Sequence, residues 1–197
     1  MRRRRSPDVH TGTAVKRAKL IPTAEVTTGP FFPPRYVDEG ASDLTACEGR
    51  KAKGEAIDIR GRVQQEDGSP LENLIVEIWQ ADSHGIYRHP ADPRSARADP
   101  DFLGWGRAAT DAKGNYRFRT IVPGAAQGRA PHINFMLMSS GLMRILKTTM
   151  FFGNAADPVL MAVPAPRRGL LIARKDQGVY EFNIRLRGED ETPFFDD

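Results

Sequence analysis

Apolar and polar residues alternate along several short segments of the chain, and this period of two restricts its fold more than any other feature. In "YEFNIRLRG", residues 180–188, the side chains of Tyr180, Phe182, Ile184 and Leu186 share one face. Successive side chains of a β-strand point to opposite faces, whereas a helix repeats every 3.6 residues. The segment therefore predicts a half-buried strand.

The same alternation recurs at residues 56–63 and 115–121, and the denser apolar run "LIVEIW" at 74–79 is typical of a central strand. We expect helix to be scarce, since residues 41–53 are too polar and glycine-flanked to form more than a short helical turn. We predict an all-β fold, a single antiparallel β-sandwich with long inserted loops. Turn sequences rich in Gly, Asp and Pro separate the predicted strands: "EDGSP" at 66–70, "DAKGN" at 111–115 and "VPG" at 122–124.

Two segments do not fit simple hairpins. Residues 82–104 form a long polar stretch with three prolines, and long ordered loops on a sandwich often carry function. Residues 21–36 contain four prolines, which exclude a helix or a central strand. We predict that 21–36 is an extended N-terminal arm suited to lying across another surface. The alternative is that the arm merely packs on its own sandwich.

The basic character of the chain comes from its first twenty residues. Residues 1–20 hold seven Lys or Arg against a single acid, whereas the whole chain has a net charge of only +4. The body, 21–197, is therefore slightly acidic, and we infer no nucleic-acid-binding domain. We expect 1–20 to be a disordered, solvated tail; contact with RNA or a membrane surface is the alternative. No apolar run follows the arginines, so we expect no export signal.

Length and cysteine content place further limits on the protein. A chain of 197 residues suits one domain with a sizeable core. Cys47 is the single cysteine, which excludes a disulfide framework or a thiolate zinc cluster within one chain and fits a reducing cytoplasm. No segment has the apolar length of a membrane-spanning helix. Gly-rich phosphate loops, G-x-S-x-G and Cys-His pairs are missing, which argues against kinase, hydrolase and thiol-enzyme functions.

Few side chains could carry chemistry. In "APHINF", residues 130–135, strand geometry places His132 and Asn134 on one face, where a His-x-His pair would begin a metal site. Asn is a poor substitute because its neutral amide oxygen binds metals weakly. Tyr87 lies between His84 and His89 in "SHGIYRHP". A tyrosinate combined with imidazole nitrogens suits ferric iron better than zinc or copper.

Several motifs together resemble the intradiol ring-cleavage dioxygenases. The segments "VEIWQADSHGIYRHP", "DFLGWGRAATDAKGNYRFRTIVPG", "RAPHINF" and "RLRGEDETPFFD" occur in the order typical of that family. The resemblance runs from about Val26 to the C-terminus. Within heteromeric members, "GEDETPFFD" and "APHIN" point to the non-metal α-type chain rather than to the iron-bearing β-type chain.

The resemblance implies a ligand set that this chain only half retains. In the β-type chain, two tyrosines and two histidines hold Fe(III). The first tyrosine aligns with Tyr87 and the first histidine with His132, but Ala126 and Asn134 stand where the second of each is expected. Tyr87 and His132 are then vestigial ligand positions that pack structurally. The expectation is that Fe(III) is held by a partner β subunit, with no catalytic residue in this chain alone.

The resemblance also assigns a role to the arm. In this family each active site lies between an α-type and a β-type chain, and a Thr-x-Gly-Pro motif approaches the partner's substrate. That motif aligns with Thr27, Gly29 and Pro30, followed by Phe31. Gly lets a backbone come close and Pro stiffens it, which fits such a role. The implied partners are the iron-bearing β subunit, a small aromatic substrate and O2.

One position departs from the α-type pattern. Similar chains carry an arginine that helps to meet the substrate carboxylate, and here that position is Ser140. A serine hydroxyl cannot replace a charge-assisted, often bidentate arginine contact in strength. Either Arg129 or Arg144 supplies the charge, or the substrate differs.

A protein of another class remains open at this point. The chain could be an iron-free, homomeric β-sandwich that binds aromatic acids in the vestigial pocket without chemistry. A tight homo-oligomer of the chain purified alone would favour it, whereas an unstable lone chain would favour the subunit. An independent iron enzyme conflicts with Ala126 and Asn134.

Overall fold

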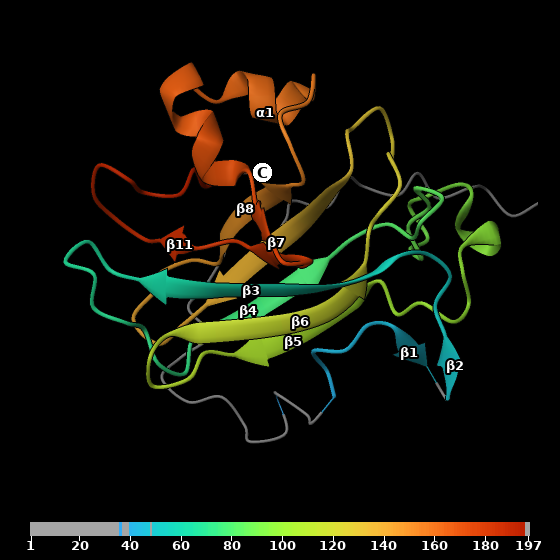
Figure 1. Cartoon of the computed structure of the whole chain (residues 1–197), viewed down its shortest axis with the longest axis horizontal. Coiled ribbons are helices and arrows are strands. Elements are labelled where there is room, and N and C mark those ends of the chain that lie inside the picture. Colours follow the sequence, from blue (N-terminus) through green and yellow to red (C-terminus); the bar gives the residue numbers. More distant parts are fainter. Residues whose placement is uncertain (1–35, 37–39, 48, 196–197) are drawn as a thin grey trace, which may run out of the picture.

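Two β-sheets stack face to face in the computed structural model, which describes residues 36, 40–47 and 49–195 (Figure 1). One sheet is antiparallel throughout, in the order β5-β4-β7-β8. The predicted central strand is the inner strand β4. The strands of this sheet are β4 (Ile75–Trp79), β5 (Trp105–Ala109), β7 (His132–Met138) and β8 (Leu146–Phe151).

The second sheet is built around β3, the longest strand. On one side β3 pairs with β6, antiparallel, and on the other side it pairs with β10 and β11, while β9 adds to β10. A small separate pair, β1 (Ala46–Cys47) with β2 (Arg50–Lys51), precedes β3. The strands of the second sheet are β3 (Ala56–Gln64), β6 (Asn115–Ile121), β9 (Arg174–Asp176), β10 (Val179–Glu181) and β11 (Ile184–Arg185).

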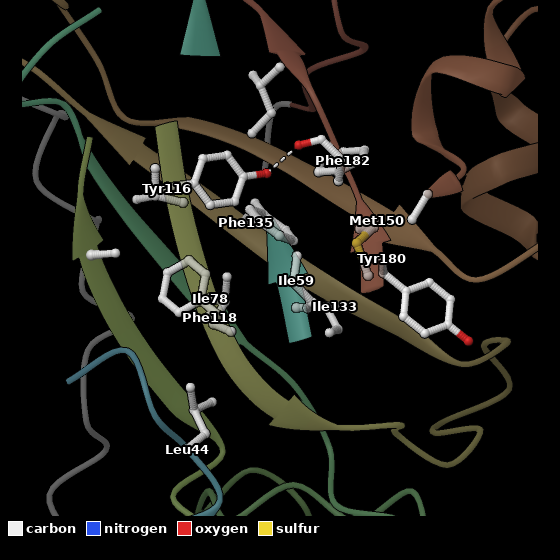
Figure 2. Packing of buried hydrophobic residues seen from close by; sticks show 14 of the residues in the cluster. Leu44, Ile59, Ile78, Tyr116, Phe118, Ile133, Phe135, Met150, Tyr180 and Phe182 are labelled. Carbon is white, nitrogen blue, oxygen red and sulfur yellow. Dashed lines mark hydrogen bonds between the residues drawn. The ribbon is translucent and has the colours of Figure 1, made fainter. Parts of the chain in front are cut away.

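The core lies between the two sheets and is formed by the side chains that the alternation predicted. Ile59 and Phe118 from one sheet meet Ile78 and Phe135 from the other, all fully buried (Figure 2). Burying an apolar side chain of this size contributes about 1.5–3 kcal/mol. The predicted β-sandwich is confirmed.

The segment 180–188 differs from the prediction of one continuous strand. It forms two short strands, β10 and β11, which run parallel to β3 and are separated at Phe182 and Asn183. The hydroxyl of Tyr116 donates a hydrogen bond to the Phe182 carbonyl inside the core (Figure 2). The side chain of Asn183 accepts from the Arg62 amide where the backbone ladder is interrupted, at 3.0 Å.

Gly61 makes that interruption possible. A side chain on this β3 residue would overlap both the Phe182 carbonyl oxygen and the Tyr116 hydroxyl. The absence of a Cβ therefore lets the hydroxyl reach a carbonyl that has left the ladder. The split strand is a consequence of this tertiary contact, which alternation along 180–188 does not encode.

Helix is scarce, as predicted, and lies beside one edge of the sandwich next to β8 (Figure 1). The α-helix α1 (Pro158–Ala162) is followed by a 3-10 helix at Ala165–Leu171, and a 3-10 turn covers Ser95–Arg97. Asp157 caps α1, and Pro158 occupies its first turn, where no amide donor is needed. Within the described residues, no helix is long and apolar enough to span a membrane.

Candidate functional site

Tyr87 and His132 meet on the outer face of the β5-β4-β7-β8 sheet. His132 begins β7, and Tyr87 enters from the long loop that follows β4. Their side chains are buried, and the Tyr87 hydroxyl lies 3.1 Å from Nε2 of His132. The structure thus brings together the two residues that the sequence assigned to one site, 45 positions apart in the chain.

Buried aspartates hold the loop that positions Tyr87. Asp82 accepts hydrogen bonds from the backbone amides of Ile86 and Asp99, at 3.0 and 2.9 Å. Asp92 accepts from the Tyr87 amide at 3.1 Å and from the Arg94 guanidinium. The loop backbone is therefore anchored where it presents Tyr87, because it donates hydrogen bonds to carboxylates that are themselves buried.

The polar groups at the site form one directed chain of hydrogen bonds. Nδ1 of His132 lies 2.7 Å from the Ala130 carbonyl, which can only accept, so Nδ1 carries the proton. In the neutral ring Nε2 then accepts from the Tyr87 hydroxyl. The Asn134 amide points at the same hydroxyl oxygen at 3.5 Å, and Thr149 donates to the Asn134 oxygen at 3.2 Å.

Burial keeps both ionisable groups neutral. It raises the pKa of the Tyr87 hydroxyl above its usual value and lowers the pKa of the His132 imidazole. In both cases desolvation disfavours the charged form. A phenol and a neutral imidazole therefore face each other at neutral pH.

Ala126 occupies the position where the resemblance places a second tyrosine. It is buried and packs against Ala81 and Tyr87 in a small cluster of its own. A side chain on Gly85 would overlap the Ala125 carbonyl oxygen, so the loop and the turn after β6 approach backbone to backbone. Gly85 also adopts φ +72°, which favours glycine.

A cavity of about 220 Å³ opens beside these residues. Arg129 is held at its edge by Asp157, whose side chain is fully buried and accepts from Nε of Arg129 at 2.7 and 2.9 Å. The residues that line the cavity are Trp79, Tyr87, His89, Ala91, Asp92, Ala126, Gln127, Arg129, His132 and Asn134.

Sequence reasoning missed Trp79 and Asp92, which line the cavity, and Asp157, which holds Arg129 at its edge. Trp79 and Asp92 gave no signal of their own. Asp157 was also missed, although Asp followed by Pro is a helix-start signature that could have indicated α1. Of the two arginines considered for a substrate carboxylate, Arg129 is paired with Asp157 and lines this cavity.

Most of the other residues named from the sequence lie away from this cavity. Ser140 and Arg144 are exposed in the β7–β8 connection, at the opposite end of β7 from His132. His84 is exposed and lies beside Ser83, whereas His89 reaches the cavity. The arm residues Thr27, Gly29, Pro30 and Phe31, and the tail 1–20, lie outside the described residues.

Comparisons with known proteins agree with this β-sandwich fold and identify the family of the chain. The model of a family described as "Dioxygenase" matches residues 27–188. The chain belongs to the intradiol ring-cleavage dioxygenase family.

Relatives of known function give the same family. The protocatechuate 3,4-dioxygenase beta chain of Burkholderia cepacia is 42% identical over 172 residues, covering 77% of this chain and 73% of the relative. The alpha chain from the same organism is 36% identical over 196 residues, covering 90% and 98%. The alpha chain of Pseudomonas putida is 34% identical, also covering 90% and 98%.

Solved structures confirm the fold. An intradiol ring-cleavage dioxygenase from Tetranychus urticae superposes with a TM-score of 0.55 at 20% identity, covering 82% of this chain and 92% of that one. A 3-chlorocatechol 1,2-dioxygenase from Rhodococcus opacus 1CP gives a TM-score of 0.53 at 22% identity, covering 83% and 70%.

Proposed function

We propose that this chain is the non-metal α subunit of a heteromeric protocatechuate 3,4-dioxygenase, with an iron-bearing β subunit as its partner. The complex would cleave protocatechuate (3,4-dihydroxybenzoate) with O2 between its hydroxyl-bearing carbons, giving 3-carboxy-cis,cis-muconate. Such a reaction belongs to aromatic compound catabolism. The name of the relatives, protocatechuate 3,4-dioxygenase alpha and beta chains, supports a two-chain enzyme.

The observation that carries the proposal is the donor set around Tyr87. A 3.1 Å separation between Tyr87 and His132 would suit two neighbouring ligands of one ion as well as a hydrogen bond. The other two ligand positions decide whether the site can bind a metal ion. The side chain of Ala126 has no donor atom, and that of Asn134 offers only a neutral amide. Tyr87 and His132 alone supply two of the four donors that the resemblance implies for Fe(III), and two such donors do not fit a ferric ion.

Sequence identity bears on the chain type. Overall identity favours the beta chain, at 42% against 36%. The assignment to α therefore rests on the site residues Ala126 and Asn134.

The role of this chain is to complete the partner's site. Fe(III) held by the β subunit would supply the activation of the catechol. Thr27, Gly29, Pro30 and Phe31 of this chain would border the substrate, shape the pocket and exclude water from it. Excluding water strengthens the electrostatic contacts made inside a site.

The metal assignment is tested by iron analysis. The chain expressed alone in iron-replete medium is expected to be colourless and iron-free, because half of the ligand positions lack a suitable donor. Co-expression with an iron-bearing β chain should give a coloured complex with one iron per α–β pair. Stoichiometric ferric iron with a tyrosinate charge-transfer band in the lone chain would overturn the proposal.

The arm is tested by Gly29→Val in the co-expressed complex. A branched side chain at this position should intrude on the substrate pocket and lower kcat/KM about 10–100-fold, which corresponds to about 1.4–2.7 kcal/mol. Iron content and ferric colour should persist, because the metal sits in the other chain. Phe32→Ala is the matched control: it should weaken assembly more than substrate binding. Wild-type kinetics for Gly29→Val in an intact complex would remove the arm from the active site.

The second candidate is an iron-free homomeric protein that binds aromatic acids, and the cavity beside Tyr87 favours it. Gel filtration distinguishes the two functions. A stable homo-oligomer that forms no complex with the β chain would support the binding protein. Recovery of dioxygenase activity only when the two chains are mixed would support the subunit.

A further inference from the structure

We propose that Arg107 is a positioning residue: together with Glu77 it clamps Tyr36, the last residue of the predicted arm 21–36, and so fixes the point from which the arm extends. The inference rests on the proposed function, because it concerns the arm that would border the partner's substrate. Arg107 itself touches no substrate in this scheme. The clamp, formed by Glu77, Arg107 and Tyr36, lies on the outer face of the β5-β4-β7-β8 sheet and does not line the cavity beside Tyr87.

Glu77 is a buried carboxylate on the inner strand β4, on the face that points away from the core. Its side chain is 9% exposed, and burying a charge is costly unless the charge is paired. Arg107 lies directly opposite on β5 and supplies the pair. Its Nε donates to Oε1 of Glu77 at 2.6 Å, and its Nη2 donates to the same oxygen. The ion pair therefore holds the Arg107 guanidinium in one orientation.

In that orientation the guanidinium binds Tyr36. Its third nitrogen, Nη1, donates to the Tyr36 carbonyl at 2.8 Å. The guanidinium carbon lies 3.7 Å from the centroid of the Tyr36 ring and 4.9 Å from that of Trp105. A cation over an aromatic ring is attracted more strongly when water is kept away, and the Arg107 side chain is 16% exposed. The Tyr36 hydroxyl adds a weak contact to the Met138 sulfur at 3.9 Å.

The chain is also fixed shortly after Tyr36. The Arg107 amide donates to the Ala41 carbonyl at 2.9 Å, and the Leu44 amide donates to a carbonyl of β6 at 2.8 Å. Leu44 is fully buried and packs over Gly106, where a side chain would overlap it. Arg107 therefore binds the chain at Tyr36 through its side chain and at Ala41 through its backbone.

The clamp matters because it stands at the base of a long lever. Gly29 lies seven positions before Tyr36, so an extended chain can place it up to about 25 Å from the clamp. A small rotation at Tyr36 would displace that end of the arm by a much larger distance. A misplacement of 1 Å at a reacting centre can cost about 100-fold in rate, even when its origin is remote. Arg107 would thus act on the reaction through the position of the arm.

Limited digestion of the lone chain with trypsin tests the clamp. The Arg35–Tyr36 peptide bond is a trypsin site, and cleavage there requires Tyr36 to leave its contacts. Arg107→Lys keeps a positive charge for Glu77 but removes the planar guanidinium that binds the Tyr36 ring and carbonyl. We expect cleavage at least fivefold faster in Arg107→Lys, followed by mass spectrometry of the fragment that begins at Tyr36.

Two further variants serve as controls. Arg117→Lys makes the same exchange in a surface pair, since Arg117 is 71% exposed and meets Asp58 at 2.9 Å, and should be cleaved at the wild-type rate. Tyr36→Phe keeps the ring and the carbonyl and should keep the protection. Thermal unfolding shows that each variant is folded. Unchanged cleavage at Tyr36 in a folded Arg107→Lys chain would overturn the clamp.

Kinetics of the complex co-expressed with the β chain test the positioning role. Arg107→Lys should lower kcat/KM for protocatechuate at least threefold while iron content stays unchanged. The loss should shrink when Gly29→Val is already present, because both changes act through the arm, and coupled sites are not additive. The same loss with and without Gly29→Val would show that Arg107 does not act through the arm, which would refute the positioning role.

The two experiments separate this inference from the proposed function. If Arg107→Lys exposes Tyr36 to trypsin but Gly29→Val has wild-type kinetics, the clamp stands and the place of the arm at the active site fails. If Gly29→Val lowers kcat/KM but Arg107→Lys leaves the trypsin site protected, the proposed function stands and the clamp fails.

Discussion

Replacing Asp157 with Asn should destabilise the protein and loosen the turn that carries Arg129. The Asp157 side chain is fully buried, and its two oxygens accept from four different groups. Oδ1 accepts from the amides of Val159 and Leu160 at the start of α1, and Oδ2 from the Ala130 amide at 2.9 Å. Nε of Arg129 reaches both oxygens.

The magnitude follows from these contacts. Asn can keep the Oδ1 contacts, because it is also a good helix cap. Its NH2 group replaces Oδ2, however, so the Ala130 amide loses its acceptor and the Arg129 guanidinium loses its counter-charge. Each buried donor left without an acceptor costs about 1–3 kcal/mol. Removing one partner of a fully buried ion pair costs about 3–5 kcal/mol, and Arg129 is 20% exposed, which reduces that figure. We expect a loss of about 3 kcal/mol.

For a chain of this length, about 3 kcal/mol corresponds to a fall in Tm of about 6–12 °C. Scanning calorimetry and urea unfolding at neutral pH measure the loss. Asp176→Asn is the matched control, because Asp176 meets Arg60 at 3.5 Å with both side chains about half exposed. Such surface pairs contribute about 0–1 kcal/mol. An Asp157→Asn protein as stable as the control would refute the reasoning.

The same carboxyl gives a pH signature. Burial by itself would raise the pKa of Asp157, but hydrogen bonds from Arg129 and the backbone amides outweigh it and lower the pKa. A lowered pKa in the folded state contributes stability above the usual carboxyl value, about pH 4, which is lost as the pH falls through the folded-state pKa. Asp157→Asn should therefore flatten the acid limb of the stability curve.

Two further predictions concern other buried groups. Tyr116→Phe should cost about 1–3 kcal/mol in chemical denaturation, because the Phe182 carbonyl is left without its donor in the core; a cost below about 0.5 kcal/mol would show that the contact is dispensable. Hydrogen bonds from Arg94 lower the pKa of Asp92 from 3.8 to about 2, so its stabilising contribution is present above pH 3.8 and is lost as the pH falls toward 2. Asp92→Asn should remove that dependence in acid titrations followed by circular dichroism, and an unchanged acid transition would contradict the assignment.

Much of the candidate site could be predicted because the ligand-type residues sit in short motifs. Tyr87, His132, Ala126 and Asn134 were assigned to one place from sequence, and all four line the same cavity. The polar surroundings could not be predicted. Arg129 and Asp157 lie 28 positions apart and meet only because α1 returns to the turn before β7. An ion pair of that kind has no local sequence signal.

Local sequence alone determined the strands and their buried faces. Alternation places Ile57, Ile59 and Val63 on one side of β3 whatever the strand pairs with, since side-chain direction in an extended chain is a local property. Strand pairing, in contrast, is not a local property, because it depends on contacts between backbone groups that are far apart in the chain. The parallel docking of β10 and β11 on β3, and their separation at Phe182, were decided by the tertiary structure, through a hydroxyl of Tyr116 that reaches the Phe182 carbonyl past Gly61.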